Sequence, residues 1–424
     1  MTRLGIFAEL LKDVNLPRLA IVRQSFPKDK IDDIPGAVFE ALKRPGTLDQ
    51  IQSGQKVAIA VGSRGINNLP VIVRALVQAI HERGAIPVII PAMGSHGGAT
   101  AEGQKEVLLS LGIIPEAVGA EIISSMEVAQ VGILPDGLPV YISKDALTAD
   151  AIVLLNRIKP HTAFRGDIES GLLKILTIGL GKQKGAESCH AHGFKHMVRH
   201  LLEMGSMLLE QAPVIFGLGI VENAYDQTHS ITAIPAKRII KEEPKWLNLA
   251  KELMPSLPVD QLDVLIIDEI GKDISGDGMD PNITGRYPTP YAFGGPEISK
   301  IALLDLTERS NGNANGIGTA DLVARRLVDK MIPEQTYPNA LTSTVTGPVK
   351  IPLTLDTDYD VIRAAVKTSN ALDLNKVRLI RIKNTLRLEE FWASESVIQE
   401  LAPKGKFEIG ELQDWQFNEQ GNLF

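Results

Sequence analysis

Blocks of apolar and polar residues alternate over residues 56–112 in a pattern that predicts two consecutive strand–loop–helix units. Each unit has a short apolar run, then a Gly-containing polar loop, then a segment with helical spacing of its apolar residues. The first unit (56–84) consists of the strand KVAIAV, the loop GSRGINN and the helix LPVIVRALVQAIHERG. The second unit (86–112) consists of the strand IPVIIPAM, the loop GSHGGAT and the helix AEGQKEVLLSLG. This succession is typical of a parallel α/β sheet, in which ligands bind at the carboxyl ends of the strands.

Further apolar runs extend the pattern. Ile152–Leu155 is a predicted strand followed by a polar loop, and PVIFGLGIVENA (213–224) reads as a strand and turn. A new apolar run begins at Leu262, after the Pro-punctuated stretch MPSLPVDQ. We therefore predict two α/β domains with mainly parallel sheets and an active-site cleft between them. Residues 1–260 form the catalytic and cofactor-binding domain, and residues 261–424 form a domain that closes over the cleft.

Composition supports this division and narrows the class of protein. A chain of 424 residues exceeds the usual size of one core, and 44% hydrophobic with 22% charged residues is ordinary for a globular protein. A net charge of −7 argues against a nucleic-acid or anionic-membrane partner.

No apolar run approaches the roughly 20 residues of a membrane span, and charges interrupt the N-terminal segment. The single cysteine excludes an internal disulfide framework. We expect a cytoplasmic protein.

Two histidines and one arginine follow predicted buried strands. His96 and His161 lie in such loops, where a pair of imidazoles is suited to acid–base chemistry near neutral pH. The alternative is that each ring merely hydrogen-bonds the backbone of its loop. Arg64, after the first strand, is placed to hold a carboxylate or a phosphate, although a surface arginine would look the same.

Lys174 stands in an unusually apolar run. On a helix, Ser170, Thr177 and Gly181 would share its face, so these small residues predict either room for a ligand or an amphipathic helix with a snorkelling lysine. A desolvated amine would also become more nucleophilic. GLGKQKG, the stretch after this run, fits neither the P-loop nor the dinucleotide-binding pattern, so classical nucleotide binding is not expected.

The segment after Lys174 is rich in histidine. His192, His196 and His200 are spaced by four residues, and a helix carrying the last two could bind zinc, but His196 and His200 are expected on its solvated face. His190, expected in a loop before that helix, is freer to be a metal ligand. The loop containing Asp273, Asp277 and Asp280 lacks the final glutamate of an EF-hand, so we interpret it as a polar loop at the crevice.

In their order along the chain, GSRG, GSHGGAT, KPHTAF, SGLLK and CHAHG, with EIGKD in the second domain, resemble the nickel-dependent lactate racemase family. The resemblance implies a nickel pincer nucleotide tethered covalently to Lys174, with His190 as the nickel ligand. His192 is a reserve candidate for that role. It implies that His96 and His161 are the acid–base pair and that Arg64 handles an anion of the substrate or cofactor. Lys272 matches a further active-site lysine more loosely.

The resemblance implies racemisation or epimerisation of a 2-hydroxy acid by reversible hydride transfer to the nucleotide. Enzymes that make the cofactor are then required partners, and protein from a host without them is expected to be apo. Val61 replaces an acidic residue of the family, and a proline after the lysine motif is absent. These departures alter the substrate pocket, so a larger 2-hydroxy or sugar acid is as good a candidate as lactate. Two alternatives stay open: a zinc hydrolase using the histidines of residues 190–200, and a non-catalytic binding protein of the same fold.

Overall fold

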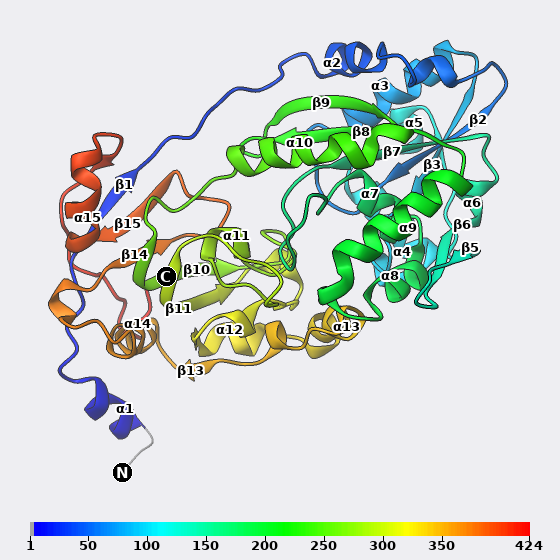
Figure 1. The fold of residues 1–424 in the computed structure, drawn as a ribbon. Coiled ribbons are helices and arrows are strands. Elements are labelled where there is room, and N and C mark those ends of the chain that lie inside the picture. The colour runs from blue at the N-terminus through cyan, green and yellow to red at the C-terminus, as the bar shows by residue number, and fades with distance from the viewer. Residues whose placement is uncertain (1–3) are drawn as a thin grey trace. The chain divides into compact units, whose positions relative to one another are not determined.

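A computed structural model describes residues 4–424, and this part of the chain divides into two compact units (Figure 1). One unit is Pro27–Met254, and the other combines the segment up to Phe26 with Pro255–Phe424. The division lies a few residues before the predicted boundary. The prediction that all of residues 1–260 form one domain is wrong, because strand β1 (Leu19–Arg23) pairs antiparallel with β15 (Glu390–Ser394) of the other unit. A five-residue apolar run cannot reveal its distant partner strand.

The unit Pro27–Met254 is built on a sheet whose described strands follow the order β4-β3-β2-β7-β8-β9. All neighbours are parallel except the β8–β9 pair. In that order the strands are β4 (Glu121–Ile122), β3 (Ile86–Pro91), β2 (Lys56–Val61), β7 (Ala151–Arg157), β8 (Val214–Glu222) and β9 (Thr228–Pro235). The strands predicted at 56–61 and 86–93 are thus confirmed as β2 and β3, and the parallel α/β class is confirmed with them.

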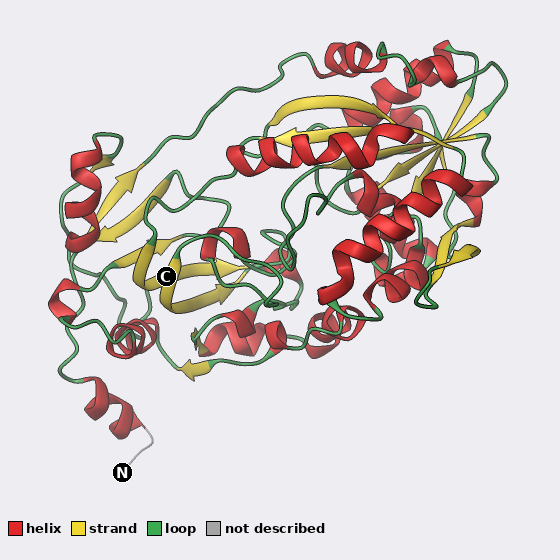
Figure 2. Ribbon diagram, viewed as in Figure 1, coloured by secondary structure: helices red, strands yellow, loops and turns green. Residues whose placement is uncertain are grey.

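Helices cover this sheet (Figure 2). The core on one face joins the apolar sides of α2 and α3 to alternate residues of β2, β7 and β8. The longer helices are α2 (Ile34–Leu42), α3 (Leu69–Glu82), α4 (Ala101–Ser110), α8 (Lys182–His190), α9 (Met197–Gln211) and α10 (Ile239–Leu253). Short elements are α5 (Pro115–Val118), α6 (Lys144–Leu147), α7 (Leu172–Lys174), the π-helical η3 (Ile175–Gly179) and the hairpin of β5 (Val128–Ile133) and β6 (Pro139–Ser143).

The described part of the other unit contains a sheet of order β13-β12-β11-β10-β14-β15-β1-β16, parallel from β13 to β14 and antiparallel beyond. Its remaining strands are β10 (Gln261–Ile270), β11 (Glu297–Leu306), β12 (Leu322–Ala324), β13 (Leu353–Leu355), β14 (Leu379–Ile382) and β16 (Glu408–Ile409). Its helices are α1 (Leu4–Leu11), α11 (Pro281–Thr284), α12 (Arg325–Lys330), α13 (Pro333–Ser343), α14 (Asp358–Thr368) and α15 (Glu395–Leu401).

Single 3₁₀ turns complete the chain. They are η1 (Leu48–Gln50), η2 (Gly97–Ala99), η4 (Phe194–His196), η5 (Ala236–Arg238), η6 (Glu308–Ser310), η7 (Ile317–Thr319), η8 (Gly347–Val349), η9 (Leu374–Lys376) and η10 (Ala402–Lys404). Among the described helices, none combines the length and the apolar character that crossing a bilayer requires.

Candidate functional site

The loops after β2, β3 and β7 carry Arg64, His96 and His161. These three strands are adjacent and parallel, and Val61, the last residue of β2, pairs with both Pro91 and Leu155. Their carboxyl ends therefore meet at one edge of the sheet, where ligands bind in open parallel sheets. Arg64 is exposed, whereas the two histidines are partly buried.

His96 joins two of these loops. Its Nδ1 lies 2.5 Å from Oγ of Ser63, which follows β2. The backbone around His96 is held from α4, because Nε2 of Gln104 donates to the carbonyl oxygens of Gly94 (2.8 Å) and His96 (3.3 Å). Gly94 has a φ of +60°, a conformation that favours glycine. The loop is thus anchored on both sides of the imidazole.

His161 is oriented through both its ring and its backbone. Its Nδ1 accepts a hydrogen bond from the backbone N–H of Ala163 at 3.0 Å, so the neutral ring carries its proton on Nε2. Its backbone N–H donates to Oε2 of the buried Glu169 at 2.7 Å. Burial lowers the pKa of His161 well below its ordinary value, and the positive charge of Lys174 and proximity to His190 lower that pKa further.

Glu169 was not predicted from the sequence. Besides the His161 backbone, its carboxylate contacts Arg165 (3.2 Å) and Lys251 (2.7 Å), so it ties the loop after β7 to helix α10. A glutamate between Ile168 and Ser170 carries no local pattern that marks it as buried. Only the tertiary contacts identify it as an organising residue of this loop.

Lys174 ends α7 and directly precedes the π-helical turn η3, and π-turns recur at functional sites. Two bonds fix this segment against the sheet edge. Nδ2 of Asn156 in β7 donates to Gly171 O at 2.8 Å, and the Gly94 N–H donates to Gly179 O at 3.1 Å. The segment carrying Lys174 and the loop carrying His96 are therefore directly bonded through their backbones.

The small residues near Lys174 do not line open space. Thr177 is 2% exposed, and its hydroxyl donates to Leu173 O at 3.0 Å. A Cβ on Gly181 would lie 2.4 Å from Thr177 O, so this glycine permits close packing. The interpretation of these two residues as space for a ligand is wrong. The prediction of a regular amphipathic helix is also wrong, because the backbone changes from the α-helical turn α7 to the π-helical turn η3 directly after Lys174.

His190 is the last residue of α8, so its predicted place in a loop is wrong. Its Nδ1 is bonded to Ala186 O at 2.7 Å, which places the ring proton on Nδ1 and the lone pair on Nε2. Burial lowers the pKa of His190, and the Ala186 bond opposes that effect. The neutral imidazole with an oriented second nitrogen is the state that binds metals. The neighbouring Cys189 is an inert bystander, because burial raises its pKa to about 12.

Lys174, His161 and His190 share one electrostatic environment. The positive charge of Lys174 lowers the pKa of both histidines, after the larger effect of burial in each. The ring of Phe194 lies 6.3 Å from that of His161 and 5.5 Å from that of His190. The structure thus brings together three of the predicted site residues, in a segment already bonded to the loop of His96.

Lys182 is a further residue that sequence analysis missed. It is 0% exposed, and its Nζ donates to Pro91 O (2.6 Å) and to Oε1 of Gln104 (2.9 Å). Since Gln104 also donates hydrogen bonds to the His96 loop, the ammonium group of Lys182 stabilises that loop through Gln104. Burial lowers the pKa of Lys182 to about 8, although Asp145 opposes the change. In the sequence, GLGKQKG was compared only with phosphate-binding patterns, and nothing in it indicated that Lys182 is buried and supports a loop.

The low pKa of Lys182 predicts how stability changes with pH. Below about pH 8 the amine is protonated in both the folded and the unfolded state, and burying its charge lowers the free energy of unfolding. Between about pH 8 and 10.5, the ordinary pKa of lysine, only the folded state loses its proton, so this destabilisation disappears as the pH rises. The free energy of unfolding should rise across this range by about 3 kcal/mol more in the wild type than in Lys182→Met. Chemical denaturation at several pH values measures this difference. The exposed Lys184→Met should behave as wild type, and equal slopes in all three proteins would contradict the prediction.

The histidines after His190 form a separate group. His200, expected on a solvated face, is 0% exposed because it lies on the buried face of α9, where its Nδ1 donates to Cys189 O at 3.0 Å. Among the described residues, His192 and His200 gather with Asp136 into an arrangement able to hold a metal ion. His190 is not part of that group, so the zinc site postulated from His190 and its neighbours is not assembled as expected.

Lys272 belongs to the other unit, in the loop after β10. Its Nζ donates to Gly276 O at 2.7 Å, and its N–H donates to Oγ of Ser310 at 2.8 Å. Asp277 of this loop accepts a hydrogen bond from Nδ2 of Asn315 in the loop after β11 (3.1 Å), and Asp280 caps α11 at Asn282 (2.9 Å). These contacts agree with a polar loop.

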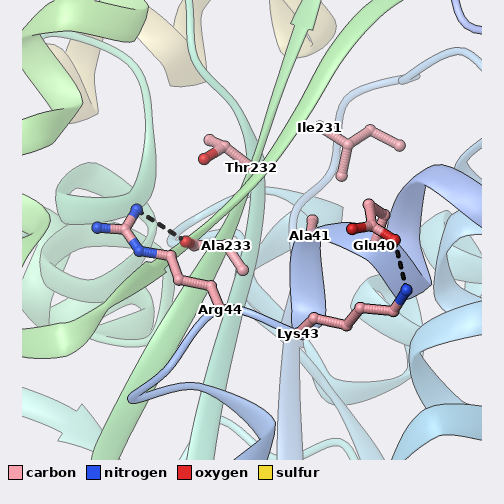
Figure 3. Close-up of a pocket in the computed structure, with 7 residues that line it drawn as sticks. All are labelled: Glu40, Ala41, Lys43, Arg44, Ile231, Thr232 and Ala233. Carbon is pink, nitrogen blue, oxygen red and sulfur yellow. Dashed lines mark hydrogen bonds and ion pairs between the residues drawn. The ribbon is translucent and has the colours of Figure 1, made fainter.

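A hollow in the unit Pro27–Met254 lies between α2 and β9, away from these loops (Figure 3). Its polar groups are already paired: Lys43 with Glu40 at 2.6 Å, and Arg44 with Ala233 O at 3.2 Å. It is lined by Glu40, Ala41, Lys43, Arg44, Ile231, Thr232 and Ala233. None of the predicted site residues is among them.

The fold and the edge site define an α/β protein with titratable side chains gathered at the carboxyl ends of parallel strands. Residues 13–200 match the family described as the lactate racemase N-terminal domain. The chain shares its fold with the lactate racemase apoprotein from Thermoanaerobacterium thermosaccharolyticum, at a TM-score of 0.50 and 13% identity over 87% of this chain and 99% of that one. No curated protein matches the sequence significantly.

Proposed function

We propose that this protein is a racemase or epimerase of a 2-hydroxy acid and that it uses a nickel pincer nucleotide tethered to Lys174. The observation that carries the proposal is the grouping of His161 and His190 around Phe194, with ring centroids 6.3 Å and 5.5 Å from its ring, beside the Lys174 segment that is hydrogen-bonded to the loop of His96. The match of residues 13–200 to the lactate racemase N-terminal domain supports a racemase-type enzyme. The substrate and the cofactor are our inference.

The residues present fit such a cofactor. The bond from Nδ1 of His190 to Ala186 O orients Nε2 as a ligand for nickel, a metal that accepts imidazole readily. The amine of Lys174 is the only group of this chain that the family resemblance assigns to the tether. When bound, the nucleotide supplies a hydride acceptor, and the protein supplies position and charge.

The chain's own residues would handle the hydroxyl proton and the carboxylate. The two enantiomers of a 2-hydroxy acid present their hydroxyl groups differently to one cofactor face, so two proton-exchanging groups are needed, and His96 and His161 fill these roles. His161, with its proton on Nε2, is set to donate to a carbonyl oxygen. His96, held by Ser63 at Nδ1, would exchange its proton through Nε2.

The exposed Arg64 would bind the substrate or cofactor anion. Lys272, in the other unit, stays a predicted catalytic residue. Val61 is fully buried at the end of β2, where the family resemblance implies an acidic residue. Because the pocket differs at this point, we propose a 2-hydroxy or sugar acid as the substrate class rather than lactate alone.

The proposal is tested by intact mass and nickel analysis of protein produced together with the cofactor-making enzymes. We expect a covalent increment of nucleotide size and about one nickel per chain, together with racemisation of at least one member of a panel of 2-hydroxy acids, followed by chiral chromatography. Protein with neither increment nor nickel under conditions that load a known lactate racemase would contradict the proposal.

His190→Ala separates the metal from the tether. We expect this variant to keep the covalent mass increment but to lose most of its nickel, because a ligand has been removed while the amine of Lys174 is intact. Metal analysis and intact mass on the same sample measure both quantities. His81→Ala, an exposed histidine on α3, is the matched control and should keep its nickel. Full nickel content in His190→Ala would show that another residue is the ligand.

A further inference from the structure

Asp136, His192 and His200 come from different parts of the unit Pro27–Met254 and converge at one point. Asp136 lies in the turn between β5 and β6, His192 lies in the turn after α8, and His200 lies in the first half of α9. The carboxylate oxygen Oδ2 of Asp136 is 3.5 Å from Nδ1 of His192 and 3.4 Å from Nε2 of His200. We propose that these residues form a zinc site, independent of the proposed racemase chemistry, that clamps the α8–α9 turn to the β5–β6 hairpin.

The spacing of the ligand atoms fits tetrahedral zinc. Zinc binds histidine nitrogen and carboxylate oxygen at about 2.0–2.1 Å, so two ligands of a tetrahedral site lie about 3.4 Å apart. The two distances from Asp136 agree with that value, and all three ligand atoms lie within 4.8 Å of one another. Because the side chain of His192 is 42% exposed, a zinc ion can enter from solvent and keep a water as its fourth ligand.

The buried member of the group is prepared for a metal. His200 is 0% exposed, and its Nδ1 is bonded to Cys189 O at 3.0 Å. That bond places the proton on Nδ1 and leaves a lone pair on Nε2, the nitrogen that faces Asp136. A ligating histidine that donates its other N–H to a backbone carbonyl is the usual outer-shell arrangement of zinc sites.

A cationic group stands where the zinc would bind. Nη2 of Arg199 lies 2.5 Å from Oδ2 of Asp136 and 3.1 Å from Nε2 of His200, so it donates to both ligand atoms. Its side chain is 43% exposed, and its other terminal nitrogen lies 3.7 Å from Glu203. The guanidinium can therefore swing out to solvent and to Glu203 while zinc takes over its contacts. A neutral residue at position 199 should favour zinc, because this competitor is removed.

The test uses the full-length chain, stripped of metal with a chelator and titrated with zinc chloride against a chromophoric competitor. We expect about one zinc per chain in the wild type, at least tenfold weaker binding in His192→Ala and in Asp136→Asn, and tighter binding in Arg199→Gln. His192 is exposed, so its replacement should leave the fold intact, which circular dichroism checks. Zinc should raise the melting temperature of the wild type and not of His192→Ala.

Two control variants distinguish this site from the proposed active site. His81→Ala and His190→Ala should bind zinc as the wild type does, whether or not the chain proves to be a racemase. The proposal is overturned if the wild type shows no saturable binding, or if His192→Ala and Asp136→Asn bind unchanged. It is equally overturned if His190→Ala loses the zinc, since the metal would then occupy the proposed nickel site, or if Arg199→Gln binds more weakly than the wild type.

Discussion

Lys174→Ala, produced together with the cofactor-making enzymes, is expected to carry no covalent nucleotide and to have no detectable racemase activity. The amine is the tether, and no other group in η3 or α8 replaces it in the proposed scheme. The expected loss is complete rather than graded, because the hydride acceptor itself is not retained. Intact mass spectrometry gives the first readout, and chiral analysis of the reaction with the panel of 2-hydroxy acids gives the second.

Lys184→Ala is the matched control for this experiment. Lys184 belongs to α8, the helix that follows η3, and its side chain is exposed, so its loss should leave mass increment and activity unchanged. Lys174 is partly buried, yet the segment around it is held by hydrogen bonds from the Asn156 side chain to Gly171 O and from the Gly94 N–H to Gly179 O, so alanine should not unfold it. A mass increment that survives in Lys174→Ala would show that the tether lies elsewhere.

His96→Ala and His161→Ala are each expected to lower racemisation in both directions by about 10²- to 10⁴-fold while nickel content stays at the wild-type level. Loss of a positioned acid–base group has an effect of this size. Both directions are affected because each histidine serves one enantiomer, and the overall interconversion needs both. Initial rates from each pure enantiomer, combined with nickel analysis of the same protein, provide the measurement.

His229→Ala is the control for these variants, since His229 lies in β9 and pairs with Ser230 Oγ at 2.7 Å. Its activity should equal that of the wild type. If either His96→Ala or His161→Ala keeps full activity in both directions, the two-group scheme fails. If nickel is lost together with activity, that histidine takes part in cofactor binding, and its assignment to proton exchange is wrong.

Local periodicity was enough to predict the central strands of the unit Pro27–Met254. The runs 56–61 and 86–93 became β2 and β3, and helices followed each loop, because a buried parallel strand needs a short apolar run and an amphipathic helix needs a fixed spacing. The same rule placed Arg64, His96 and His161 after predicted strands, and the sheet order of the structure makes those strands neighbours. These residues share one edge because each follows the carboxyl end of a parallel strand of the same sheet.

Other features depended on contacts between distant residues. The affiliation of β1 with the other unit required its pairing with β15, and no local pattern of five residues encodes a partner so far along the chain. Lys182 and Glu169 were not singled out from the sequence, and the fold buries both and gives them hydrogen bonds. The burial of a charged side chain depends on partners that the sequence does not place beside it.

The region from Lys174 to His200 shows both contributions together. The sequence by itself determined which side chains could bind a cofactor or a metal, because the chemistry of an amine or an imidazole is local to its residue. Only the tertiary structure decided their grouping: Lys174 and His190 lie in one electrostatic environment with His161, whereas His200 turns toward Asp136. Lys174, His190 and His200 lie in three successive helices, α7, α8 and α9, so the packing of each helix decides which partners its side chain faces.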